Sequence, residues 1–430
     1  MERSGEEVEE NLVMLHGYGA GLGFFYNNFE GLSRVKGWKI WALDLLGMGR
    51  SSRPPFRVHA KDQQGKITEA EDWFIDALEE WRVQRKIDRF TLLGHSLGGY
   101  MAVAYALKYP GRVNKLILAS PVGIPEDPYA VNAAMPEPDS STLANELTQS
   151  ADDIVNQSNP KIAEADKVGA GDNNNFLNAR SKAEKASSTQ KAGSGSGDKT
   201  TPGAPRRPIP SWLTYLWDAN ISPFSIIRWT GPLGPRFVSG WTSRRFSHLP
   251  SEQSEALHTY SYSLFRQRGS GEYALAYILA PGAFARSPLI RRIQDVGRQR
   301  LRPTPAESTT PAEPATPAAT VSPSTADTRS SALQQFSRET GIPVIMMYGE
   351  NDWMDIAGGY AAQAKLEAAK ARVLQDPLTT DEERRRERGD AQVIIIKKAG
   401  HHVYLDGWEE FNEVMRETMR QTSRDDGLKP

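Results

Sequence analysis

The chain of 430 residues contains no cysteine. Disulfide bonds, a thiol nucleophile and a thiolate metal site are therefore excluded. The sequence also lacks any run of about 18 apolar residues, so we expect no membrane-spanning helix. Lysine plus arginine (52) nearly balance aspartate plus glutamate (53), for a formal charge of -1. Without a broad field of one sign, we expect no nucleic-acid partner.

Six short apolar segments are rich in branched side chains and are bounded by glycine or proline, which predicts buried strands. They are NLVML, WKIWALDL, RFTLLG, NKLILAS, IPVIMMYG and AQVIIIKKAG. Segments such as EDWFIDALEEWRVQRK and YMAVAYALKYP lie between them and show helical periodicity. Alternating strands and helices predict an α/β fold, with a mostly parallel sheet covered by helices on both faces.

Two polar segments divide the predicted fold. Residues 136–208, rich in Ser, Asn, Asp, Lys and Gly, predict a disordered insertion, and residues 303–330 predict a disordered linker rich in Pro, Thr and Ala. The flanking residues 1–135 and 331–430 then form the two parts of the core. Residues 209–302 predict a helical cap inserted after the fourth strand, over the carboxyl ends of the strands, where ligands bind in such sheets.

The stretch LLGHSLGGY at residues 92–100 contains the pattern G-x-S-x-G, centred on Ser96. In this pattern a serine sits on a strained turn between a strand and a helix, with its hydroxyl exposed as a nucleophile. An apolar strand segment precedes Ser96 and an amphipathic segment follows it, as the pattern requires. The alternative is a serine that only caps the helix.

A serine hydroxyl needs a base, and the base needs an acid to orient it. His401 follows the last predicted strand, and we prefer it to His402 because neighbouring side chains on a strand point apart. The acid is expected after the preceding strand, where GENDWMD offers Asp352 and Asp355. Asp352 has the spacing from Gly349 that hydrolases of this type show, and Asp355 is the alternative.

Two backbone N–H groups are expected to stabilise the oxyanion. Leu97 follows the nucleophile and supplies the first. Tyr18, in the glycine-rich loop LHGYGAG, supplies the second. His16 in the same loop is expected to bond the backbone and not to act as a proton carrier in the reaction. No residue pattern indicates a cofactor or a metal site.

The cap segment mixes aromatic residues with arginines, which suits a lipid–water interface, although helix packing is an equal alternative. We expect membrane contact from Trp212, Trp217, Phe224 and Trp229. The segment FARSPLIRRIQDVGRQRLRP is expected to hold phosphate or anionic lipid through its arginines. These are Arg286, Arg291, Arg292, Arg298, Arg300 and Arg302.

Several motifs together resemble one branch of the α/β-hydrolase superfamily. They are LHGYGAG, ALDLLGMGRSSRP, GHSLGGYMAVAYALKYPGRVNKLILASPVGIPE, SPFSIIRWTGPLGPRFV, GEYALAYILAPGAFARSPLIRRI and AGHHVYLD. This branch contains lysophosphatidic acid acyltransferases, N-acyl phosphatidylethanolamine lipases, cardiolipin-specific deacylases and the coactivator of adipose triglyceride lipase. The resemblance implies an α/β-hydrolase fold and a phospholipid or lysophospholipid substrate.

The resemblance also implies that His401 and Asp406 form the branch's His-x-x-x-x-Asp acyltransferase motif. The alternative for Asp406 is a capping box with Glu409 at the start of the last helix. The coactivator carries Asn at the nucleophile position, whereas Ser96 here favours an enzyme. Relatives have strands upstream of the LHG segment, where only about ten residues precede it in this chain.

Three functions follow as expectations: a serine phospholipase or cardiolipin deacylase, an acyl-coenzyme A-dependent lysophospholipid acyltransferase, or a non-enzymatic regulator at lipid surfaces. We prefer the first, acting in phospholipid remodelling. The start MERSGEEVEE resembles neither a secretory signal nor a transit peptide. The branch nevertheless implies a peripheral membrane protein, with the mitochondrion expected first and the cytoplasm or lipid droplet as alternatives.

Overall fold

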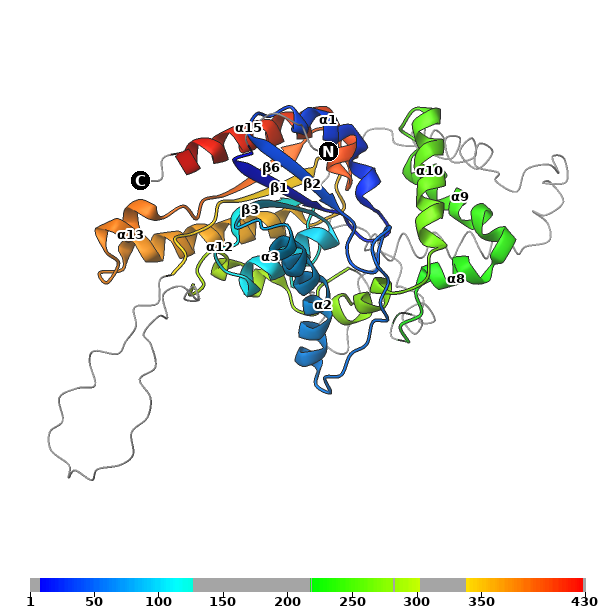
Figure 1. The fold of residues 1–430 in the computed structure, drawn as a ribbon, viewed down its shortest axis with the longest axis horizontal. Coiled ribbons are helices and arrows are strands. Elements are labelled where there is room, and N and C mark those ends of the chain that lie inside the picture. Colours follow the sequence, from blue (N-terminus) through cyan, green and yellow to red (C-terminus); the bar gives the residue numbers. More distant parts are fainter. Residues whose placement is uncertain (1–7, 127–216, 218, 281–282, 302–337, 428–430) are drawn as a thin grey trace, which may run out of the picture.

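The structure is a computed structural model that describes residues 8–126, 217, 219–280, 283–301 and 338–427 (Figure 1). The segments 136–208 and 303–330, predicted to be disordered, lie outside the described residues, as do Trp212 and Arg302. Within the described part of the chain, no helix is both long and apolar enough to cross a membrane.

Six strands form one sheet in the order β2-β1-β3-β4-β5-β6, and every neighbouring pair is parallel. Each of the six predicted strand segments overlaps one of them, with bounds that differ by a few residues, so these predictions are confirmed. The strands are β1 (Glu10–Leu15), β2 (Trp38–Leu43), β3 (Phe90–His95), β4 (Val113–Ala119), β5 (Val344–Gly349) and β6 (Ala391–Ile396).

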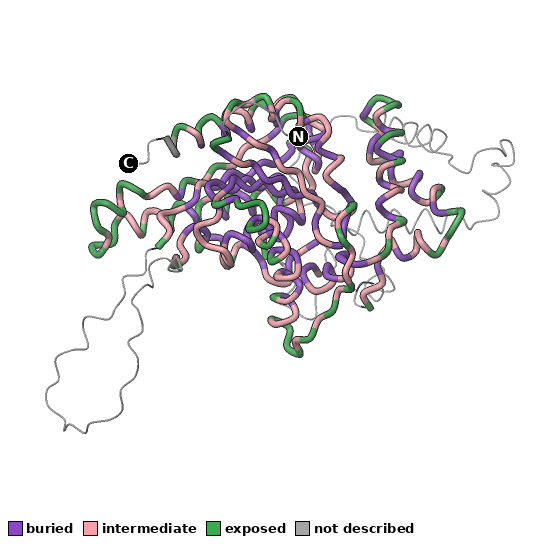
Figure 2. Tube along the Cα trace, viewed as in Figure 1, coloured by how far each residue is buried: buried purple, intermediate pink, exposed green. Residues whose placement is uncertain are grey.

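Side chains alternate between the two faces of the sheet, and both faces are apolar. On β1, Val13 and Leu15 belong to one buried cluster, whereas Leu12 and Met14 belong to a second cluster on the opposite face. Because parallel strands need helical crossovers that cover both faces, each strand is apolar almost throughout. Figure 2 shows the resulting buried centre, with exposed residues on the outer helices and loops.

Helices cover both faces of the sheet (Figure 1). One face packs against α1 (Tyr26–Ser33), α14 (Val403–Asp406) and α15 (Trp408–Gly427). The other packs against α2 (Gln63–Gln84), α3 (Leu97–Lys108) and α12 (Ile356–Gln375). The remaining elements of the core are α13 (Asp381–Arg386) and the 3-10 helix η1 (Leu22–Phe25).

The described residues of the segment 209–302, which is predicted to form a cap, are largely helical. Its elements are α8 (Pro223–Trp229), η2 (Gly231–Leu233), α9 (Gly234–Arg245), α10 (Ser251–Phe265), η3 (Gly271–Ala274), α11 (Leu275–Ile278), η4 (Leu289–Arg291) and η5 (Ile293–Asp295). In Figure 1 the helices α8, α9 and α10 stand together at one side of the sheet.

The chain changes direction along the sheet at β1, because β2 lies on one side of it and β3 on the other. Ligands bind outside the carboxyl ends of the strands at such a switch point. The loop after β1 and the turn after β3 both begin there. The fold therefore brings the glycine-rich loop LHGYGAG close to the turn that carries Ser96.

Candidate active site

Ser96 sits on the turn between β3 and α3 with φ 51° and ψ -116°. A non-glycine residue in this region carries a strain of about 1–3 kcal/mol. Four backbone hydrogen bonds hold it there: its N–H donates to the Ala119 carbonyl at 3.0 Å, and its carbonyl accepts from Gly99, Tyr100 and Val122. The hydroxyl makes no capping hydrogen bond to the helix, so the capping alternative is wrong.

The turn leaves no room for side chains around Ser96. A Cβ atom on Gly98 would lie 2.6 Å from the Leu15 carbonyl oxygen at the end of β1. A Cβ atom on Gly17, in the loop after β1, would lie 2.9 Å from the Cβ of Ser96. These two glycines therefore let the loop after β1 pass directly beside the serine.

The structure brings His401 and Asp352 together. Nδ1 of His401 lies 3.2 Å from Oδ1 of Asp352, whose side chain is fully buried. Asp352 follows β5, and its carboxylate also accepts hydrogen bonds from the backbone N–H groups of Met354 and Gly349. Burial by itself raises the pKa of Asp352. The hydrogen bond and charge of His401 and the nearby Ser120 hydroxyl outweigh it, so the pKa lies below its usual value.

Asp355 has a different place. Its side chain caps α12 by accepting a hydrogen bond from the Ala357 N–H at 3.0 Å. The structure thus pairs Asp352, and not Asp355, with His401.

His402 also points away from that pair, but not for the reason expected. His401 and His402 lie in a loop before α14, so strand alternation does not apply. His402 is buried, and its Nε2 lies 2.5 Å from Nη2 of Arg245 at the end of α9. Burial first, and Arg245 second, hold the pKa of His402 well below its usual value, so the ring is neutral and accepts this hydrogen bond.

His95, the residue before Ser96, links the serine turn to the histidine loop. Its Nε2 donates to the His401 carbonyl at 3.0 Å, and the two rings lie 4.8 Å apart. Its Nδ1 has no hydrogen-bond partner among the described residues and faces Gly17. Burial holds the pKa of His95 well below its usual value, so the ring is neutral. The hydroxyl of Ser96 itself has no hydrogen-bond partner in the described part of the chain.

One of the two predicted oxyanion donors directly follows Ser96, and the other is in the loop that passes beside it. Leu97 is the first residue of α3, where backbone N–H groups have no partner within the helix and carry the positive end of its dipole. Tyr18 follows Gly17 in the loop beside Ser96. Its ring packs against Phe224 of the cap, with ring centroids 5.0 Å apart.

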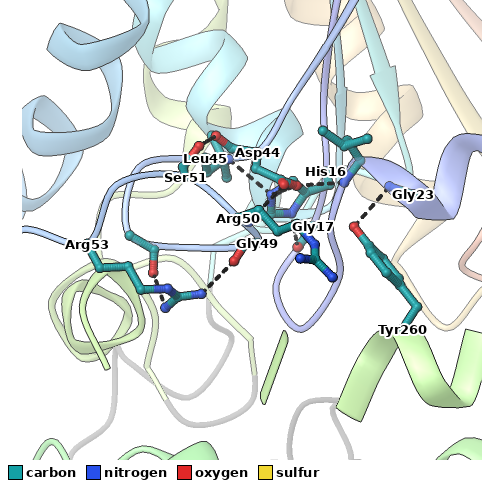
Figure 3. A network of polar contacts seen from close by, with 12 residues as sticks. His16, Gly17, Gly23, Asp44, Leu45, Gly49, Arg50, Ser51, Arg53 and Tyr260 are labelled. Carbon is teal, nitrogen blue, oxygen red and sulfur yellow. Dashed lines mark hydrogen bonds and ion pairs between the residues drawn. The ribbon is translucent and has the colours of Figure 1, made fainter. Parts of the chain in front are cut away.

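His16 holds the loop after β1 in place, as the sequence predicts (Figure 3). Its Nδ1 donates to the Gly17 carbonyl at 2.8 Å, and its Nε2 accepts from the Leu45 N–H at 3.0 Å. Burial lowers the pKa of His16, which keeps the ring neutral. Asp44 accepts hydrogen bonds from the N–H groups of Leu22 and Arg50 and so ties the loops after β1 and β2 together.

Asp406 does not form the capping box with Glu409, so that alternative is wrong. It is the last residue of α14, and its Oδ2 accepts from the Gly400 N–H at 3.0 Å. Its Oδ1 lies 2.9 Å from Nε2 of His248, in the cap. A tight turn between α14 and α15 thus directs the carboxylate to the loop that carries His401.

The cap side chains correct two expectations about lipid contact. Trp217 is buried and donates to the Leu279 carbonyl, and Phe224 stacks on Phe265 with centroids 4.5 Å apart. Only Trp229, 74% exposed, faces outward among the expected aromatic residues that the structure describes.

Most arginines of the segment FARSPLIRRIQDVGRQRLRP that the structure describes bind partners within the protein. Arg292 binds the buried Glu71, Arg298 binds Glu387, and Arg291 binds Glu126. Arg286 donates to the Ala276 carbonyl. These pairs hold the segment to the core, whereas Arg300 and the ion-paired Arg291 remain exposed to solvent.

The arrangement combines a tight turn that carries a strained serine, a histidine paired with a buried carboxylate, and helix N–H groups beside the serine. Among the described residues no cluster of three His, Cys, Asp or Glu side chains could hold a metal ion. Sequence reasoning missed the roles of His95, Arg245 and His248. The local signal for His95 is its place inside G-H-S-L-G, whereas the two cap residues give no local signal.

Comparison with known proteins agrees with this geometry. A probable 1-acylglycerol-3-phosphate O-acyltransferase of Oryza sativa subsp. japonica is 26% identical over 98% of this chain and 70% of its own length. The 1-acylglycerol-3-phosphate O-acyltransferase ABHD5 of Rattus norvegicus is 27% identical over 94% and 76%. A human (lyso)-N-acylphosphatidylethanolamine lipase is 25% identical over 94% and 78%. A family model described as alpha/beta hydrolase fold matches residues 10–407, so the chain belongs to the α/β-hydrolase family.

Proposed function

We propose that this protein is a serine-dependent acyl hydrolase of phospholipids, acting through Ser96, His401 and Asp352. The observation that carries the proposal is the 3.2 Å contact between His401 and the buried Asp352, in a loop that His95 ties to the serine turn. A buried carboxylate fixes the imidazole tautomer and stabilises the imidazolium that forms during the reaction. The names of the relatives support a lipid substrate with an acyl group.

In the proposed reaction the Ser96 hydroxyl attacks the acyl carbonyl carbon, and Nε2 of His401 takes the hydroxyl proton. The N–H groups of Leu97 and Tyr18 bind the oxyanion that forms. The carbon–oxygen bond to the lysophospholipid then breaks, and His401 returns the proton to the leaving oxygen. Water, activated by His401, attacks the acyl-serine and releases a fatty acid.

The second candidate function is acyl transfer. Two of the three relatives above are named as acyltransferases, and Asp406 holds the loop of His401. A lipid hydroxyl in place of water would resolve the same acyl-serine intermediate, so both reactions use the same residues. Which acceptor reacts depends on how well the cap keeps water from the site.

A phospholipid panel separates the two. The purified protein is incubated with phosphatidylcholine, phosphatidylethanolamine, phosphatidic acid or cardiolipin, with and without lysophosphatidic acid and acyl-coenzyme A. Release of free fatty acid without an acceptor supports the hydrolase, whereas product only with the acceptor pair supports the acyltransferase. The Ser96→Ala variant is the control, and a product that it still forms does not come from the proposed chemistry.

A further inference from the structure

One end of the cap exposes apolar side chains to solvent. Trp229 at the end of α8 is 74% exposed and Leu233 in η2 is 56% exposed, and Pro232 beside Leu233 is exposed too. We call the residues 229–233 the cap tip. Figure 1 shows that the junction of α8 and α9, which contains the tip, lies away from the sheet. Tryptophan at such a tip suits a lipid interface, because its ring has an apolar body and a polar N–H.

The cap around this tip is positively charged. Residues 219–280 contain six arginines against three glutamates, whereas the whole chain has a net charge of -1. Arg266 and Arg268 are exposed and flank Gln267. The Gln267 carbonyl accepts from the guanidinium of Arg228, the residue before Trp229, at 3.2 Å. Exposed arginines therefore lie close to the apolar tip.

The tip is connected to the candidate active site by a single short helix. Phe224, near the start of α8, packs on Tyr18, and Trp229 ends the same helix. At 1.5 Å per residue these two positions are about 8 Å apart along the axis. The cavity between Tyr18, Phe224 and Phe265 measures only about 30 Å³, which holds one or two water molecules. An acyl chain cannot enter a cavity of this size unless the residues that line it move, and Phe224 of α8 is one of them.

We propose that the cap tip docks on an anionic phospholipid surface, with Trp229 and Leu233 entering its apolar layer and Arg266 and Arg268 facing its phosphates. Docking at one end of α8 acts on Phe224 at the other end, next to the oxyanion loop. The lipid surface that supplies the substrate is thus the one that the tip binds. The role of docking in substrate supply rests on the proposed function, but vesicle binding can be measured without turnover.

The test uses vesicles of phosphatidylcholine alone or mixed with phosphatidic acid, and the full chain carrying Ser96→Ala, so that turnover cannot alter the lipid. We expect binding to the mixed vesicles, weak binding to phosphatidylcholine alone, and a decrease with rising salt. Trp229→Ser with Leu233→Ser should weaken binding by roughly tenfold or more. Arg266→Gln with Arg268→Gln should weaken it by about tenfold and reduce the salt dependence.

Two matched controls lie far from the cap tip, because α13 and the junction of α8 and α9 are at opposite ends of the molecule in Figure 1. Leu378, between α12 and α13, is 89% exposed, so Leu378→Ser removes an exposed apolar side chain elsewhere. Arg385→Gln with Arg386→Gln removes two charges from α13, where both side chains are more than half exposed. Circular dichroism and thermal melts check that each variant folds. Unchanged binding by the tip variant, an equal loss in Leu378→Ser, or equal binding to both vesicle types contradicts the docking proposal.

Failure of the proposed function has a different signature. If the protein binds vesicles through the tip but releases no fatty acid in the phospholipid panel, the docking proposal is supported and the hydrolase proposal is contradicted. If the protein releases fatty acid from dispersed lipid but does not bind vesicles, the hydrolase proposal is supported and the docking proposal is contradicted.

Discussion

Nε2 of His95 donates a hydrogen bond to the carbonyl oxygen of His401, so the residue before the serine holds the backbone of the residue proposed as its base. Ser96 and His401 are 305 positions apart in the sequence, and this hydrogen bond links the two segments that carry them. Nothing else in the described part of the chain bonds the ring of His95. We therefore treat His95 as a positioning residue.

Two replacements of His95 distinguish a role in positioning His401 from a role in packing alone. His95→Leu removes the donor, and we expect kcat to fall by about 10- to 100-fold with KM little changed, because a small displacement of a reacting group is costly. His95→Gln places an N–H near the position of Nε2 and should recover most of the rate. Steady-state kinetics on a soluble ester measure both, and equal losses in the two variants would assign His95 a packing role only.

The two aspartates after β5 differ in their contacts, and their variants should differ accordingly. Asp352→Asn keeps the shape but removes the charge facing His401, and we expect a loss in kcat of roughly 10^3- to 10^4-fold. Asp355→Ala removes the cap of α12 and should lower the free energy of unfolding by about 1 kcal/mol while sparing kcat. The opposite ranking of kcat would transfer the role of the acid to Asp355.

The contacts of Asp406 predict one effect on both candidate reactions. Asp406→Ala leaves the Gly400 N–H without its acceptor, which costs about 1–3 kcal/mol of stability and loosens the loop of His401. Hydrolysis and any acyl transfer should therefore fall by the same factor. His248→Ala is the control, since His248 is 44% exposed and its pairing contributes at most about 1 kcal/mol. Loss of transfer alone, with hydrolysis unchanged, would give Asp406 a direct chemical role.

Much of the core follows from local patterns. Six apolar segments mark the strands, and the pattern around Ser96 marks the turn, because burial and tight turns leave signatures within a few residues. The cap contacts leave none. Arg245 and His402 are 157 positions apart, and nothing near Arg245 indicates that it meets a buried neutral histidine.

The incorrect expectations share a cause. Trp217 and Arg292 have the composition of a lipid-binding surface, but the fold buries the first and pairs the second with Glu71. Asp406 and Glu409 have the spacing of a capping box, but the chain turns between two helices and sends the carboxylate to Gly400. Composition and spacing show which interactions a side chain is able to make. Tertiary contacts decide which of these interactions it makes in the folded protein.

The cap should be sensitive to acid. Burial lowers the pKa of His258 in α10 to about 4, from about 6.5 in the unfolded chain. The unfolded chain therefore binds a proton that the folded chain does not, and the stabilising effect of the neutral ring, present above about pH 6.5, is lost progressively as the pH falls towards 4. At pH 5 we expect a loss of about 2 kcal/mol relative to pH 7.

Denaturant unfolding of the wild type and of His258→Gln at pH 7 and pH 5 measures this effect. The variant should lose less stability between the two pH values, because glutamine does not titrate. Buried His95 and His402 act in the same direction in both proteins, so the difference between the two proteins isolates His258. An identical pH dependence in both proteins would contradict the assignment.

The central claim is that Ser96 is a nucleophile activated by His401 and Asp352, and covalent labelling tests it most directly. A fluorophosphonate probe reacts only with an activated serine, and mass spectrometry of the labelled protein locates the adduct. We predict one adduct on Ser96 in the wild type, none in Ser96→Ala, and a labelling rate at least 10^3-fold lower in His401→Ala, which corresponds to about 4 kcal/mol of barrier. Labelling of Ser96→Ala at the wild-type rate, or a wild-type Ser96 that does not react, would contradict the account.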